Sequence, residues 1–131
     1  MHQEINIGML FILLTLHWIC DFVLQTDKQA KGKSNNWSDL LAHTGSYTLG
    51  FFAAYCLAIT ITLPHDPATF NLNLLWFFPI TFICHTATDY YTSRINAELW
   101  KDKRLHDFFV SIGFDQLLHI VQLVLTYQLV S

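Results

Sequence analysis

Histidine and aspartate side chains recur four residues apart at three places in this 131-residue chain. The three pairs are His17 and Asp21, His85 and Asp89, and Asp115 and His119. Because residues four apart lie on one face of a helix, each pair would present an imidazole beside a carboxylate. His43 adds a fourth candidate segment. Imidazole and carboxylate together suit zinc, iron or manganese, so the pattern predicts a divalent metal site built from these seven side chains.

The chemistry expected of such a site is hydrolysis. A bound ion would generate hydroxide from water and polarise a phosphoryl or acyl oxygen. Zinc is the first expectation, with iron and manganese as alternatives, and the number of ligands allows one ion or two. One carboxylate, Asp21 or Asp89, could act as the general base instead of as a ligand, since these two lie nearest the expected opening of the site.

Neutral amides and lysines accompany these groups. Gln25 and Gln116 are expected to orient the ligands by hydrogen bonding rather than to bind the ion. Lys28 and Lys31 could hold an anionic substrate, although two cations beside anionic lipid would give the same pattern.

The elements that must position these residues are apolar. Hydrophobic residues make up 53% of the chain and charged residues 13%, against about 25% charged in soluble proteins. Four stretches approach the roughly 20 residues that cross a bilayer as a helix. They cover residues 5–25, 40–63, 72–91 and 108–130. We therefore expect an all-α, single-domain, four-helix transmembrane bundle over residues 1–131, with the lipid bilayer as its surroundings.

Basic residues predict the orientation of this bundle. All seven Lys and Arg residues lie in the connections 26–39 and 92–107. By the positive-inside rule these connections are cytoplasmic, and both termini lie with the 64–71 connection on the other side of a multi-pass inner-membrane protein. Measured along each helix from the nearest basic residue, most of the His and Asp side chains lie roughly 8 to 17 Å deep. They can therefore meet in the cytoplasmic half.

The same residues carry a resemblance to a known family. The sequence His-x-x-x-Asp-Phe-x-Leu-Gln-Thr-Asp begins at His17, and a histidine opens the second apolar stretch at His43. His-x-x-x-Asp-Tyr begins at His85, and Asp-Gln-x-x-His begins at Asp115. With these motifs in this order, the chain resembles the bacterial and phage family of integral membrane proteins catalogued as domain of unknown function 3307. The resemblance implies a membrane location and brings no established reaction.

Three functions stay open at this point. The first is a metal-dependent hydrolase acting on a lipid or phosphoester. The second is a protein that translocates protons or metal ions, which would need polar groups continuing to the far side of the bundle, and the outer halves of the stretches are mostly apolar. The third is a non-enzymatic modulator of a membrane protein partner, with a structural polar core. A homo-oligomer is compatible with each. A net charge of −3 argues against a nucleic-acid partner.

Overall fold

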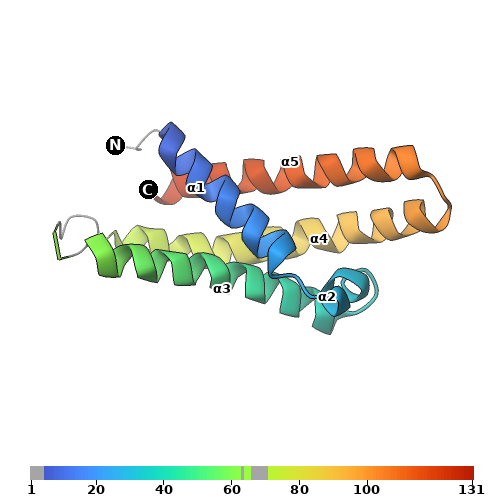
Figure 1. Ribbon diagram of the computed structural model, residues 1–131, viewed down its shortest axis with the longest axis horizontal. Helices are drawn as coiled ribbons and strands as arrows, with labels where there is room; N and C mark the ends of the chain where they lie inside the picture. Colours follow the sequence, from blue (N-terminus) through green and yellow to red (C-terminus); the bar gives the residue numbers. More distant parts are fainter. Residues whose placement is uncertain (1–4, 63, 66–70) are drawn as a thin grey trace.

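The computed structural model describes residues 5–62, 64–65 and 71–131 (Figure 1). Within these residues the secondary structure is helical throughout, which confirms the predicted all-α class. The α-helices are α1 (Ile7–Trp18), α2 (Asp27–Gly32), α3 (Trp37–Thr62), α4 (Phe77–Lys101) and α5 (Leu105–Val130). A π-helix, η1 (Ile19–Val23), continues α1, and a 3₁₀ helix, η3 (Leu72–Trp76), precedes α4.

The three long helices α3, α4 and α5 lie alongside one another, and α1 crosses them obliquely (Figure 1). Helix α4 contacts both α3 and α5 along its length, and α1 contacts α3 and α5. The start of α1 and the ends of α3 and α5 lie toward one end of the molecule, while α2 and the turn between α4 and α5 lie toward the other (Figure 1). The two basic connections therefore share one end, which we call the basic end.

Two helices, α3 and α5, are long and apolar enough to cross a membrane by length and composition. The apolar segment Ile7–Val23, formed by α1 and η1, is shorter. The four predicted stretches thus correspond to helical segments, and two of them meet this criterion for a span on their own.

The helix bounds differ from the bounds of the predicted stretches. The first stretch does not run as one regular helix to residue 25, because α1 gives way to η1 and the helix ends before Gln25. The connection 26–39 contains α2, whose Thr26 and Gln29 form a reciprocal capping box. Helix α4 continues ten residues past the predicted end at 91, to Lys101. In the predicted 64–71 connection, residues 66–70 lie outside the described part of the chain.

The interior of the bundle is unusually polar and its exterior unusually apolar. Among the residues that the structure describes, thirteen polar or charged residues are buried, including Asp21, Asp89 and Asp115. Large hydrophobic side chains such as Phe11, Leu57 and Leu125 are at least 60% exposed. A water-soluble protein rarely exposes so many large apolar side chains while it buries several carboxylates.

Close packing between α3 and η1 fixes the position of Asp21. A Cβ atom added to Gly50 would lie 2.5 Å from the Sγ atom of Cys20, so the Cys20 side chain or one of the two segments would have to shift. Glycine therefore lets the two segments approach each other at this level. The π-helical turn then directs Cys20 and Asp21, both buried, toward the interior. Such turns are often found at functional sites.

Candidate metal centre

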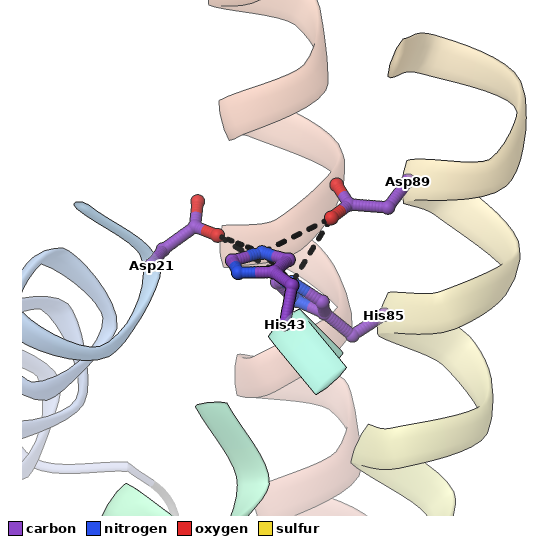
Figure 2. Close-up of side chains that lie close together, drawn as sticks. All are labelled: Asp21, His43, His85 and Asp89. Carbon is purple, nitrogen blue, oxygen red and sulfur yellow. Dashed lines mark hydrogen bonds and ion pairs between the residues drawn. The ribbon is translucent and has the colours of Figure 1, made fainter. Parts of the chain in front are cut away.

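Six of the seven predicted ligands meet in the interior, in two groups that share one residue. The first group is Asp21, His43, His85 and Asp89, and the second is Asp89, Asp115 and His119. Within each group the potential ligand atoms all lie within 4.8 Å of one another. All six residues are at most 7% exposed. Figure 2 shows the first group, with side chains from η1, α3 and α4 pointing toward one another.

The first group has the spacing of a tetrahedral site. The Nε2 atom of His43 lies 3.1 Å from Oδ1 of Asp21 and 3.1 Å from Oδ2 of Asp89. The Nε2 atom of His85 lies 3.4 Å and 3.6 Å from the same two oxygens, and 3.3 Å from Nε2 of His43. Ligands about 2.0–2.1 Å from a tetrahedral zinc ion are separated by about 3.3–3.4 Å. The five distances that involve an imidazole are therefore close to those of a tetrahedral zinc site, and the two carboxylate oxygens lie within 4.8 Å of each other.

The second group is smaller and lies against the first. The Nε2 atom of His119 lies 3.2 Å from Oδ1 of Asp89 and 3.4 Å from Oδ1 of Asp115. The His119 ring stacks on the His85 ring at 4.1 Å between centroids, and His85 stacks in turn on Tyr47 at 3.9 Å. This column of three rings restricts both imidazoles, so their Nε2 atoms keep facing the carboxylates.

His17 lies beside the cluster and belongs to neither group. Its Nε2 atom contacts Oε1 of Gln116 at 2.8 Å, and its Nδ1 atom contacts the Tyr47 hydroxyl at 2.9 Å. Because a carbonyl oxygen only accepts, Nε2–H must donate to Gln116, and in the neutral ring Nδ1 then accepts from Tyr47. Both ring nitrogens are thus used within the protein, which gives His17 a positioning role in this arrangement.

The two glutamines contact ligand residues directly. The Nε2 atom of Gln116 donates to Oδ2 of Asp21 at 3.2 Å and to Oδ2 of Asp115 at 3.1 Å. The Nε2 atom of Gln25 donates to Nδ1 of His43 at 3.0 Å, from a position beyond the end of the η1 helix. The orienting role expected of both amides is consistent with these contacts.

The lysines differ from one another in what they contact. Lys28 is largely exposed and lies 3.6 Å from Asp39 on the surface. Lys31 lines a pocket of about 440 Å³ at the basic end. Lys33 lines the same pocket and reaches the cluster, where its Nζ atom donates to Oδ2 of Asp89 at 3.0 Å. Sequence reasoning missed Lys33, since the turn that follows Gly32 and directs this side chain inward leaves no distinct pattern in the sequence.

The pocket connects the cluster to the surface. Asp21, Asp115 and Gln116 of the cluster line it, together with apolar residues that include Phe22, Trp100 and Phe108. Thr92, which sequence reasoning also missed, donates to Oδ1 of Asp115 at 2.6 Å. A water or substrate molecule in this pocket can therefore reach carboxylates of both groups.

Comparison with known proteins identifies the family. The chain belongs to the family described as "Protein of unknown function (DUF3307)", which matches residues 9–131. This confirms the resemblance inferred from the motifs. No curated protein and no solved structure matches the chain.

Proposed function

We propose that this member of the DUF3307 family is a membrane-embedded, metal-dependent hydrolase whose centre opens toward the basic end. The observation that carries the proposal is the first group, which lies directly beside a pocket. Its two imidazole Nε2 atoms lie 3.1–3.6 Å from the two carboxylate oxygens and from each other, and all four ligand atoms lie within 4.8 Å of one another. Two histidines and two carboxylates favour zinc, with iron or manganese as alternatives.

Burial of several carboxylates supports a bound cation. Asp21, Asp89 and Asp115 are buried together, and in the described part of the chain Lys33 is the one lysine or arginine that forms an ion pair with them. Buried carboxylates are costly unless positive charge compensates them. One or two divalent ions would supply that charge and would activate a water molecule for attack. Of the two carboxylates considered as a general base, Asp21 lines the pocket and Asp89 does not, and in this proposal both serve as metal ligands.

The shape of the pocket favours an amphipathic, anionic substrate. Lys31 and Lys33 offer positive charge in its lining, and Trp100 and Phe108 offer apolar contact. A phosphoester or carboxylic ester of a lipid has both features. In this proposal Lys33 and Lys31 hold the anionic group, and Lys28 takes no direct part because it lies on the surface.

The membrane arrangement completes the proposal. We assign four spans, formed by α1 with η1, by α3, by η3 with the first part of α4, and by α5. The inside-out distribution of polar residues supports this assignment. With the basic end in the cytoplasm by the positive-inside rule, both termini lie on the opposite side of the inner membrane.

The test begins with metal content. The detergent-purified protein is analysed by elemental mass spectrometry beside an Asp21→Ala/His85→Ala variant, with Asp102→Ala/His106→Ala as the matched control, because the control residues are exposed at the turn between α4 and α5 and at the start of α5. We expect about one or two equivalents of metal in wild type and control, and loss in the double variant. The same samples are assayed with p-nitrophenyl phosphate, p-nitrophenyl butyrate and a short-chain phosphatidic acid.

Hydrolysis of at least one probe should disappear with chelator and return with zinc. Monodisperse wild-type protein that carries no metal above background would overturn the proposal.

A second candidate function is favoured by one observation. Beyond His119, the Nε2 atom of Gln122 donates to Thr81 at 3.2 Å and to Thr126 at 2.9 Å, so polar groups continue about 10 Å past the cluster. This track would suit a protein that translocates protons or metal ions. Zinc or proton flux into proteoliposomes, lost in Gln122→Leu and retained in the exposed-site variant Leu125→Ala, would support translocation over hydrolysis.

A further inference from the structure

The carboxylate of Asp89 faces two different sets of partners with its two oxygens. Oδ2 lies 3.1 Å from Nε2 of His43 and 3.6 Å from Nε2 of His85. Oδ1 lies 3.2 Å from Nε2 of His119. The side chain is 1% exposed, so neither oxygen is directed at solvent. A carboxylate with one oxygen in each of two ligand sets is positioned to bridge two ions.

The second set is incomplete in the manner of a reactive site. Asp89, Asp115 and His119 offer three ligand atoms within 4.8 Å of one another, and Asp115 lines the pocket. Catalytic zinc sites typically use three protein ligands and keep one position for water or substrate. The first set has four protein ligands, like a closed site. The first set therefore suits an ion held by protein ligands alone, and the second suits an ion that also binds water or substrate.

The side-chain amide of Gln116 contacts one carboxylate in each set. The Nε2 atom of Gln116 donates to Oδ2 of Asp21 in the first set and to Oδ2 of Asp115 in the second. Both carboxylates then direct Oδ1 toward the imidazoles, at 3.1 Å from His43 and 3.4 Å from His119. The Oε1 atom of Gln116 accepts from His17, which the Tyr47 hydroxyl orients. A hydrogen-bond chain that spans both sets would be superfluous around a single ion.

We infer that the centre binds two divalent ions bridged by Asp89: an inner ion held by Asp21, His43, His85 and Asp89, and an outer ion held by Asp89, Asp115 and His119. This inference rests on the proposed function and narrows its substrate class to phosphoesters. Paired ions stabilise the attacking and the leaving oxygen of a phosphoryl transfer. Two ions and Lys33 also outweigh the charge of three carboxylates, so the site attracts an anionic phosphate.

Metal stoichiometry tests the inference independently of activity. Elemental analysis of wild type is compared with His119→Gln, which removes an outer ligand, and with His106→Gln, the same change at an exposed position of the same helix. We expect about two equivalents in wild type and His106→Gln, and about one in His119→Gln. Asp115→Asn serves as the second outer variant if His119→Gln is not monodisperse. Manganese-loaded wild type should give the electron paramagnetic resonance spectrum of a coupled pair of ions.

The outcomes separate this inference from the proposed function. Wild-type protein saturated with metal could bind a single equivalent and give the spectrum of isolated manganese ions. That result would overturn the inference of a second ion and leave the proposal of a hydrolase with one ion. Two equivalents and a coupled spectrum without hydrolysis of p-nitrophenyl phosphate or phosphatidic acid support the ion pair and overturn the phosphoester activity. Absence of metal overturns both.

Discussion

The half of the bundle at the basic end and the half at the opposite end are filled by different kinds of side chain. At the basic end the interior holds the His and Asp cluster and the pocket of about 440 Å³. Toward the other end a smaller cavity of about 200 Å³ is lined almost wholly by apolar residues, among them Leu13, Phe51 and Phe77. Helix packing in the second half needs no cation, whereas the first half places buried carboxylates together. Metal binding and bundle stability should therefore be separable by mutation.

The largest effect is expected at Asp89, the residue shared by both ligand sets. Asp89→Asn keeps the size of the side chain and removes its charge, so both ions lose a ligand. We expect metal to fall to background and phosphoester hydrolysis to fall by about 10³-fold, measured by elemental analysis and initial rates. Asp102→Asn, at an exposed position, is the control. Retention of full metal content in Asp89→Asn would show that the carboxylate charge is not needed for binding.

The apolar half should respond in the opposite way. Leu123 is 1% exposed within the apolar core, and Leu123→Ala leaves a cavity that costs about 2–5 kcal/mol of unfolding free energy. Metal content per folded protein should stay at the wild-type value, because Leu123 is not among the ligand sets. Thermal or SDS-induced unfolding measures the loss of unfolding free energy, and elemental analysis measures the metal content. Leu125→Ala, which removes an exposed leucine from the same helix, should change little. Loss of metal in folded Leu123→Ala would mean that the two halves are coupled.

Gln116 tests how far the polar half depends on its hydrogen bonds. Gln116→Leu keeps a similar volume but removes the bonds to Asp21, Asp115 and His17. Residues that orient ligands typically contribute about 10- to 100-fold to metal affinity, and we expect a loss in that range by competition with a chelator. Gln116→Glu should not restore affinity, because a carboxylate cannot donate to Asp21 and Asp115. Unchanged affinity in Gln116→Leu would assign the amide to packing alone.

The contrast between the halves also explains what the sequence could predict. Helix positions and the convergence of six ligands follow from apolar length, four-residue spacing and distance from basic residues. The division of these ligands into two sets was not predictable, because it depends on how each helix is rotated. The position of Gln25 required knowledge of the π-helix η1, which replaces regular helical spacing after Trp18. His17 is four residues from Asp21, the same spacing as His85 from Asp89 and Asp115 from His119. The sequence therefore could not show that Tyr47 and Gln116 contact both ring nitrogens of His17.

The smallest effect is expected at Lys33, where the polar half meets the pocket. Lys33 contacts Asp89 at 3.0 Å and lines the pocket, so in the proposed reaction it holds the anionic group of the substrate. A charge-assisted hydrogen bond contributes about 1.5 kcal/mol at the low end of its range, which applies to a pocket open to solvent, so Lys33→Gln should raise KM by about tenfold. Metal content should stay at the wild-type level, since removal of a neighbouring positive charge does not weaken cation binding.

Lys28→Gln is the matched control, because Lys28 lies on the surface beside Asp39, and its KM should be unchanged. Whether Lys33→Gln changes KM or metal content decides the role of Lys33. A raised KM with full metal content assigns Lys33 to the substrate. Metal loss in Lys33→Gln would instead show that this lysine maintains Asp89 in position for the ions, and the anionic group of the substrate would then depend on Lys31 and the metal centre.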